Sequence, residues 1–237
     1  MEPLGVISGI ILLQRKGIFD NLEEREMVTE FGKVLLFFSE TIAFIPRHGK
    51  DPQHHILPHL INHQANLKAL KDLNIKEVIG INSTGSLKPN LKPGMIAVPD
   101  DFIMVSGTPT AVHGAAFHIT PKLSFEVRQK WIEASRDCGI DVVNGGTYWQ
   151  TTGPRLETKA EIMMMSQFAD LVGMTMASEA VVAQELGLSY ASLCSVDNYG
   201  HGLGEKELTV DEILLHARRN ADIIFKIVTR YIERRTQ

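Results

Sequence analysis

Short apolar runs alternate with segments of helical period along most of this chain, and this alternation limits the fold more than any other feature. The segment 62–73 has apolar residues at helical spacing and begins with Asn62, a residue type that caps helices. The segment 76–81 that follows is typical of a short buried strand. Strands that alternate with helices form a parallel or mixed sheet. We therefore expect a single α/β domain over residues 1–237, with a mixed central β-sheet flanked by helices.

The same reading assigns the rest of the chain. Strands are predicted at 3–13, 76–81, 93–98, 141–149, 170–174 and 188–196, with a hairpin or bent strand at 34–46. Helices are predicted at 62–73, 123–138, 157–168, 177–186 and 210–234. Irregular segments are predicted at 14–32, 48–59, 82–87 and 105–121. The last of these is long for a loop in a compact domain, and loops of that length usually have a function.

Composition excludes several classes of function. The chain has 24 Lys and Arg against 28 Asp and Glu, a net charge of -4, and no basic block, which argues against nucleic-acid binding. Cys138 and Cys194 lie far apart and outside any ligand-spaced cluster, so neither a disulfide nor a zinc site is predicted. The apolar run at 3–13 lacks a basic leader and contains Ser8, and no other segment approaches membrane-spanning length. We therefore expect no membrane contact and a cytoplasmic location.

Polar residues suited to a purine base lie where several predicted strands end. Glu157 follows a Gly-Pro turn, and Thr175 and Asn198 each follow an apolar strand. Strand ends are where open α/β sheets bind ligands. A carboxylate accepts N–H donors and an asparagine both donates and accepts, which suits the N1–H and the N7/O6 edge of a 6-oxopurine. Alternatively, Glu157 is a carboxylate that interacts with a helix dipole and Asn198 is a turn residue.

Several motifs occur together in one order and spacing. They are Arg47-His48-Gly49, Gln64-Ala65-Asn66, Asn82-Ser83-Thr84-Gly85-Ser86, Gly94 with Asp100-Asp101-Phe102-Ile103, the stretch 153–161, Gly173-Met174-Thr175 with Glu179, and Asn198. Together they resemble the purine nucleoside phosphorylase and methylthioadenosine phosphorylase family over nearly the whole chain. The resemblance implies a homotrimer, with a hexamer as the alternative, that cleaves the N-glycosidic bond of a purine nucleoside. Inorganic phosphate is the implied co-substrate, and no metal or organic cofactor is implied.

For phosphate, the resemblance points to Arg47, His54, the backbone of Ser83, and Thr175. A guanidinium fork and a hydroxyl both suit phosphate oxygens. The alternatives are a surface salt-bridge partner for Arg47 and a solvated loop residue for His54. The family has a Ser or Thr hydroxyl on phosphate near its N-terminus where this chain has Ile10, so Ser8 is the candidate replacement.

For the base, the resemblance assigns Glu157 and Asn198 as the groups that bind and activate the purine. Adenine-specific members instead have Ser in place of Glu157 and Asp at the positions of Asn198 and Gly200. The pair present here therefore favours hypoxanthine or guanine. The other substrate-binding residues that the resemblance implies are Asn82, Ser83, Thr84, Gly85, Leu156 and Met174, the last of them beneath the ribose. The run Met163-Met164-Met165 has no matching role and is expected to pack the helix.

The 5′ end of the nucleoside is where the chain departs most informatively from ordinary family members. They have a histidine for the 5′-hydroxyl where this chain has Val210, and an apolar wall leaves a hydroxyl unsatisfied. Leu208, Val210 and Leu214 would instead receive a methylthio group. His118 resembles the histidine that a neighbouring subunit lends to this region, although it would otherwise be a surface-loop residue.

Three functional hypotheses follow. The first is a phosphorylase of inosine, guanosine or 5′-methylthioinosine, which gives the free base and ribose 1-phosphate or 5-methylthioribose 1-phosphate. The second is an S-methyl-5′-thioadenosine phosphorylase, which the apolar 5′ region favours and the base-binding pair opposes. The third, motivated by Ile10, is a phosphate-independent nucleosidase or a purine-binding protein.

Overall fold

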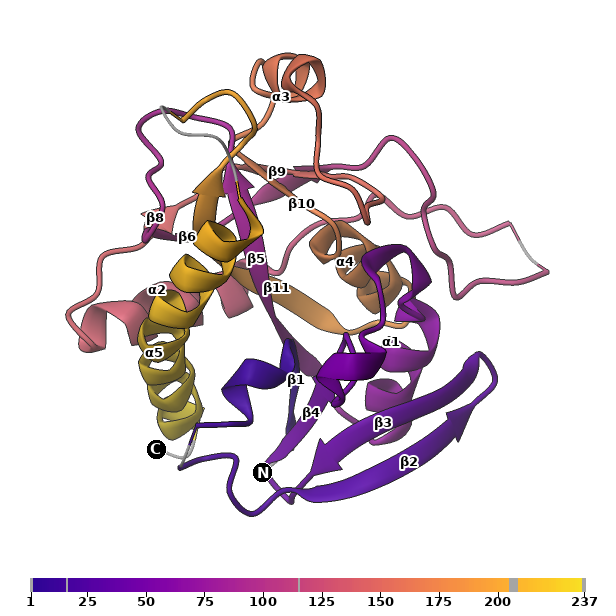
Figure 1. The fold of residues 1–237 in the computed structure, drawn as a ribbon. Helices are drawn as coiled ribbons and strands as arrows, with labels where there is room; N and C mark the ends of the chain where they lie inside the picture. Colours follow the sequence, from indigo (N-terminus) through magenta and orange to yellow (C-terminus); the bar gives the residue numbers. More distant parts are fainter. Residues whose placement is uncertain (1, 16, 115, 205–208, 236–237) are drawn as a thin grey trace.

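The computed structural model describes residues 2–15, 17–114, 116–204 and 209–235, without the side chains at 52, 210–212 and 214. One mixed sheet of 11 strands runs through the molecule, and helices cover both of its faces (Figure 1). The predicted fold class is therefore confirmed.

The elements have the following bounds. The strands are β1 (Leu4–Ser8), β2 (Glu23–Thr29), β3 (Gly32–Phe38), β4 (Ile42–Pro46), β5 (Glu77–Ser86), β6 (Ile96–Val98), β7 (Asp101–Ile103), β8 (Val143–Asn144), β9 (Thr147–Gln150), β10 (Leu171–Gly173) and β11 (Ser189–Tyr199). The α-helices are α1 (His63–Asp72), α2 (Phe125–Asp137), α3 (Lys159–Met165), α4 (Met176–Glu185) and α5 (Val210–Arg235). Short 3-10 turns, η1 to η3, span Ile10–Leu12, Pro52–His54 and Pro58–Leu60.

Strand β5 is the centre of the sheet. It pairs in parallel with β1 and β11 and antiparallel with β10, which in turn runs parallel to β9. The register places Val172 of β10 and Asn198 of β11 on either side of Gly85. A Cβ atom at Gly85 would lie 3.0 Å from Nδ2 of Asn198 and 3.1 Å from Cγ1 of Val172, so a glycine is required for this close approach.

Among the described residues, four of the five α-helices form two pairs that bury the two faces of the sheet. Helices α1 and α4 pack against one core, and α2 and α5 against the other (Figure 1). Helix α1 buries Leu67 and Leu70, and its predicted cap is confirmed because Oδ1 of Asn62 accepts the N–H of Ala65 at 2.9 Å. Helix α4 is buried over most of its surface, which fixes the position of its first turn.

Several predicted boundaries are wrong, for identifiable reasons. The segment 14–32 was expected to be irregular but contains β2, which pairs with β3 and turns charged side chains to solvent, as edge strands do. The expected turn at 82–87 is strand through Ser86, because β5 gains partners on both sides. The expected strand 141–149 is split into β8 and β9 at Gly145 and Gly146, both of which have positive φ.

Smaller differences affect the ends of elements near the site. The first strand stops at Ser8, and the chain then forms the 3-10 turn η1. Asn198 does not end its strand, because β11 continues to Tyr199. The methionine run is only partly packed: Met165 is buried, whereas Met163 and Met164 are exposed. Both cysteines are free thiols.

Candidate active site

A buried ion pair joins the end of β4 to helix α4. Arg47 is 4% exposed, and its Nε and Nη2 donate to the two carboxylate oxygens of Glu179 at 2.6 and 3.1 Å. The Tyr190 hydroxyl also donates to Glu179, at 2.6 Å. Burial opposes the charge of Arg47, but the carboxylate of Glu179 outweighs it and the pKa of Arg47 is raised. Arg47 is therefore not a surface salt-bridge partner.

The remaining contacts of Arg47 fix its guanidinium in place. Nη1 donates to the Ile81 carbonyl at 2.6 Å, and Nη2 also donates to the Ile7 carbonyl at 2.9 Å. With one N–H for each contact, the two bonds to Glu179 and these two use four of the five donors of the guanidinium. At most one N–H is left for an anion, so this arginine differs from the open fork expected from the sequence. Its role as a phosphate ligand stays a prediction.

Asn82, on the central strand β5, is in contact with Thr175, the N-cap of helix α4. Nδ2 of Asn82 donates to Oγ1 of Thr175 at 2.7 Å, and Oδ1 of Asn82 accepts from the Ser192 hydroxyl at 2.6 Å. The Thr175 hydroxyl is thus an acceptor in this contact and keeps its own proton for a further bond. Thr84, two residues after Asn82, has a hydroxyl that joins two strands, since its Oγ1 donates to the Ser195 carbonyl at 2.7 Å. Ser83, between Asn82 and Thr84, is exposed.

Glu157 is buried, with 9% exposure, and its carboxylate accepts from the Thr151 hydroxyl at 2.6 Å. It does not open helix α3 as predicted. Thr158 is the N-cap, and Glu161 completes a capping box, with Oε2 accepting the Thr158 N–H at 2.7 Å. Glu161 therefore makes the capping bond of α3, and Glu157 lies directly before the N-cap. Whether Glu157 binds a base or only interacts with the helix dipole stays a prediction.

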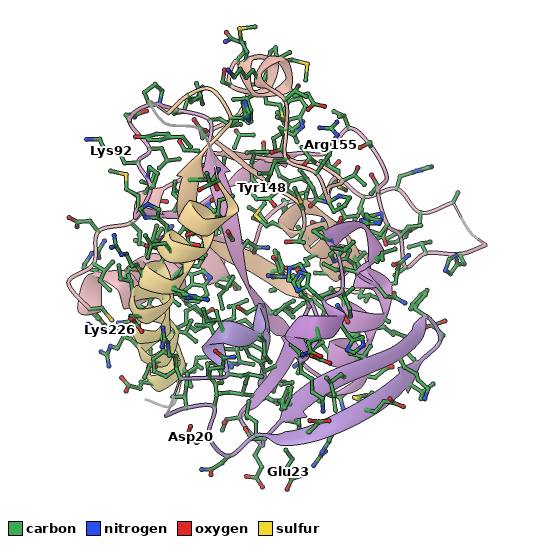
Figure 2. All side chains as sticks on the ribbon, in the orientation of Figure 1. Asp20, Glu23, Lys92, Tyr148, Arg155 and Lys226 are labelled. Atoms are coloured by element: carbon green, nitrogen blue, oxygen red, sulfur yellow. The ribbon has the colours of Figure 1, made fainter. Side chains whose placement is uncertain are left out.

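Two cavities flank the segment that follows β9. The larger, of about 280 Å³, is lined by Glu157 with Trp149 and Arg155 among others. The smaller, of about 150 Å³, is lined by Met174 and His63. The cavities share Ser106, Gln150, Thr151 and Thr152 in their walls. Figure 2 shows Arg155, in the segment after β9, toward the α3 end of the molecule and Tyr148, on β9 itself, in the interior.

Asn198 lines neither of these two cavities. It follows an irregularity in the register of β11, where Val196 pairs with Thr84 and Asn198 with Gly85. Its Nδ2 donates to the Tyr199 carbonyl at 2.8 Å. No hydrogen bond joins Asn198 to Glu157 among the described residues, so their joint action on a base stays a prediction.

The other predicted site residues lie as follows. Ser8 is buried, and its carbonyl accepts the Arg47 N–H at 3.0 Å, which brings it beside the ion pair. His54 is exposed, and its Nδ1 pairs with Asp51 at 2.5 Å. His118 is exposed in the loop after β7. Leu156 is also exposed, and Met174 packs against Gly153, whose positive φ of 66° and lack of a Cβ allow the contact.

The predicted 5′ pocket lies mostly outside the described residues. Leu208 is not described, and Val210 begins helix α5 without a described side chain. Leu214 is likewise without a described side chain. The apolar 5′ wall therefore stays a prediction.

Sequence reasoning missed two histidines beside Arg47. His48 stacks on His55 with ring centroids 4.6 Å apart, and burial with the nearby Arg47 charge lowers the pKa of His48 to about 4. His63 is 5% exposed, its Nδ1 has no hydrogen-bond partner, and burial with the same charge lowers its pKa to about 3. The adjacency of His48 to Arg47 in the sequence was a signal that could have found the first. Nothing local marks His63.

A third missed group is Asp197, which is fully buried next to Asn198. Its carboxylate accepts from the Ser195 hydroxyl at 3.0 Å and from Nδ2 of Asn220 on α5 at 2.8 Å. Burial raises the pKa of Asp197, an effect that these bonds partly offset. Asp197 thus ties the end of β11 to α5 beside the predicted base-binding residue.

The buried histidine predicts a pH dependence of stability. His63 has a pKa of about 3 in the folded chain against 6.5 ordinarily, so the folded state binds fewer protons. The free energy of unfolding should therefore fall as the pH drops below about 6.5, by up to about 1.4 kcal/mol per pH unit from this group. Between pH 6 and pH 5, the free energy of unfolding of the His63→Phe variant should fall by about 1 kcal/mol less than that of the unmodified chain. Urea unfolding at the two pH values measures both changes. An equal fall in the free energy of unfolding for the two proteins would contradict this expectation.

The described part of the chain offers neither a metal-binding cluster nor a helix that could span a membrane. Those residues contain no group of three or more His, Cys, Asp or Glu side chains placed to hold a metal ion. In the same residues, none of the helices combines the length and apolar character needed to cross a membrane.

Comparisons with known proteins agree with the fold. The model of the phosphorylase superfamily matches residues 12–233. A probable 6-oxopurine nucleoside phosphorylase of Archaeoglobus fulgidus is 39% identical over 236 residues, which cover 98% of this chain and 96% of that protein. A probable S-methyl-5′-thioinosine phosphorylase of Methanocaldococcus jannaschii is 36% identical, with 97% of this chain and 91% of that protein covered.

A solved structure of methylthioadenosine phosphorylase from Schistosoma mansoni, in complex with adenine, superposes with a TM-score of 0.88. It is 26% identical and covers 98% of this chain and 91% of its own. The family model spans nearly the whole chain, and the identities hold over nearly the full length of the relatives. This chain belongs to the phosphorylase superfamily.

Proposed function

We propose that this protein is a purine nucleoside phosphorylase that acts on 6-oxopurine nucleosides. Inorganic phosphate attacks C1′ of the ribose, the bond from C1′ to N9 breaks, and its electron pair leaves with the base. The products are a free purine and ribose 1-phosphate, or 5-methylthioribose 1-phosphate when the substrate is 5′-methylthioinosine. The names of the Archaeoglobus and Methanocaldococcus relatives support both choices of substrate.

One observation carries the proposal: Thr175 and Glu157, the proposed phosphate and base groups, lie in the segments that follow the neighbouring strands β10 and β9. Asn82 contacts Thr175 directly after β10, and the Thr151 N–H donates to the Gly173 carbonyl at 2.9 Å. Thr151 in turn holds the Glu157 carboxylate. A hydroxyl suited to phosphate and a carboxylate suited to a purine N–H are thus linked through one short segment of the sheet. This spacing suits a site that holds an anion on one side of a ribose and a base on the other.

The base end of the site supports catalysis through charge. The transition state resembles an oxocarbenium ion and leaves negative charge on the departing purine. We propose that Glu157 accepts N1–H and that Asn198 donates to N7 or O6, where this charge develops. Asn198 must then release the Tyr199 carbonyl, which its amide now contacts. Leu156, Thr84, Gly85 and Met174 complete the proposed walls around base and ribose.

The phosphate end supports nucleophile positioning. We propose that Thr175, the Ser83 backbone and Ser8 contact phosphate, while the ion pair of Arg47 and Glu179 holds β4 against α4. We propose two further donors to phosphate: His54, and the one N–H of Arg47 that is not used in the contacts described above. Inorganic phosphate is the co-substrate, and the proposal requires no metal or organic cofactor.

The oligomer and the compartment are also proposals. His118 is exposed in the long loop that projects from the body of the molecule (Figure 1), which suits a residue lent to a neighbour's 5′ region in a homotrimer. The two free thiols are compatible with a cytoplasmic location.

A second candidate is S-methyl-5′-thioadenosine phosphorylase. The close superposition on the Schistosoma enzyme favours it, as does valine at position 210. The acidic side chain at 157 opposes it, because a carboxylate has no N–H to offer to the unprotonated N1 of adenine. Both candidates require phosphate, whereas a nucleosidase would not.

A substrate panel tests the proposal. Initial rates should be measured on 5′-methylthioinosine, inosine, guanosine and methylthioadenosine, each with and without inorganic phosphate. We expect base release only with phosphate, and faster release from the 6-oxopurine nucleosides than from methylthioadenosine. Release that is independent of phosphate would favour a nucleosidase, and tight purine binding without turnover would favour a binding protein. Either result would contradict the proposal.

A further inference from the structure

We propose that Gln150 is a positioning residue that caps helix α4 in place of Thr175 and so leaves the Thr175 hydroxyl free for phosphate. The inference rests on the proposed function, because it assigns a cause to the phosphate-binding ability of Thr175. Gln150 ends strand β9 and is buried, with 7% exposure.

The cap is made by two hydrogen bonds to one residue. Oε1 of Gln150 accepts the backbone N–H of Ser178 at 3.0 Å, and Nε2 donates to the Ser178 hydroxyl at 2.5 Å. Ser178 is the third residue of α4. Its N–H is therefore one of the donors that lack a partner inside the helix.

This N–H is the one that the N-cap residue ordinarily takes. The side chain of an N-cap Ser, Thr, Asn or Asp accepts from the second or third N–H of the helix. Thr175 is the N-cap of α4 and is a capping residue type, yet its side chain makes no capping bond. Its backbone, at φ -140° and ψ -32°, also departs from the extended geometry usual at that position. A side chain from another strand has replaced it.

The other contacts of the first turn complete the arrangement. The Tyr148 hydroxyl, on the same strand as Gln150, accepts the N–H groups of Thr175 and Met176 at 3.2 and 3.4 Å. Two side chains of strand β9 thus accept hydrogen bonds from the backbone N–H groups at the N-terminus of α4. The Thr175 hydroxyl accepts instead from Asn82, which leaves its proton directed elsewhere. A hydroxyl held this way is a preformed donor for an anion.

Without the Gln150 acceptor, Thr175 should become the capping residue of α4. The Ser178 N–H would be buried without a partner, which is costly. Thr175 is the N-cap residue, so its hydroxyl can accept this N–H once its ψ shifts to the extended region, and it would then turn away from Asn82 and from phosphate. The expected cost therefore falls on phosphate binding more than on helix stability.

Gln150→Met tests this, because it keeps the size of the side chain and removes both polar atoms. We expect the KM for phosphate to rise roughly 10- to 100-fold, the loss typical of one hydrogen bond to a charged group. The KM for the nucleoside should rise much less than the KM for phosphate, because Gln150 also lines the Glu157 cavity but makes its hydrogen bonds to Ser178. Gln167→Met, at an exposed position beyond α3, is the control and should leave both constants unchanged.

A double-mutant cycle shows whether Gln150 acts through Thr175. In a Thr175→Val background, Gln150→Met should raise the KM for phosphate less than 2-fold further, because the hydroxyl is already gone. A full additional increase, or an unchanged KM in the single variant, would overturn the inference. A lack of phosphate-dependent turnover in the unmodified protein would instead count against the proposed function.

Stability measurements test, independently of activity, whether Gln150 caps helix α4. In the unmodified background, Thr175 can replace the lost acceptor, so Gln150→Met should lower the urea midpoint only slightly. In the Thr175→Val background no side chain can replace it, and the same substitution should lower the midpoint clearly more. Equal losses in the two backgrounds would overturn the inference.

Discussion

Replacing Glu157 with glutamine is expected to lower kcat/KM for inosine and 5′-methylthioinosine by roughly 100- to 1000-fold. Glutamine has the same shape but would offer an amide in place of one carboxylate oxygen, and it carries no negative charge to favour the N1–H donor. Glu157 is buried and held by Thr151, so water cannot readily take its place. Because the contact strengthens as charge leaves with the base, we expect most of the loss in kcat.

Steady-state kinetics on both nucleosides at saturating phosphate check this expectation. Glu161→Gln is the matched control, since it changes the same chemical group four residues later in the wall of the same cavity, where the carboxylate binds the helix N-terminus and Arg155. That variant should keep the order of preference among nucleosides even if its stability falls. A Glu157→Gln enzyme within about 3-fold of the unmodified one would show that Glu157 does not contact the base.

Replacing Glu179 with glutamine is expected to lower the free energy of unfolding by about 3 to 5 kcal/mol. Glu179 is fully buried and accepts two N–H groups from Arg47, which is itself buried. Removing the negative charge leaves the guanidinium in the interior with no compensating charge, although its bonds to the Ile81 and Ile7 carbonyls remain. Glutamine also turns one acceptor into a donor that faces Arg47 or the Tyr190 hydroxyl.

Urea unfolding at neutral pH measures the loss. The control is Glu26→Gln, which breaks the exposed pair with Lys33, and such pairs contribute less than about 1 kcal/mol. A loss below about 1 kcal/mol for Glu179→Gln would show that solvent reaches the Arg47 site, against its burial in the structure.

Local patterns in the sequence predicted most of the fold. Helix α1 was recognisable from its apolar spacing and from Asn62, and both were confirmed by its buried face and its cap. The long final helix α5 was also predicted within one residue at its end. Such elements have strong periods and clear ends, so tertiary contacts only reinforce them.

The errors arose where tertiary pairing overrides local preference. The small residues 82–86 resemble a turn, yet β11 and β10 bond to them on both sides and hold them as strand. The charged strand β2 lacks an apolar period because only its partner β3 gives it a place in the sheet. Neither partnership is visible in a local window of sequence.

The candidate site divides in the same way. The sequence motifs identified Glu157 and Thr175 as candidate site residues, because each lies within a recognisable motif. They could not reveal that Glu179 occupies the fork of Arg47, because the two residues are 132 positions apart. Nor could they reveal that Gln150 caps α4, since that contact depends on how β9 lies against the helix. Roles that depend on such distant contacts require the structure.

The most direct measurement is one comparison within the substrate panel. It is the ratio of kcat/KM for 5′-methylthioinosine to that for methylthioadenosine, which differ only in the purine, at saturating phosphate. The acid at 157 with the carboxamide at 198 predicts a ratio well above about 100, because a site built to hydrogen-bond one edge rejects the other. A ratio below one would show that these two side chains do not select the keto form of the base.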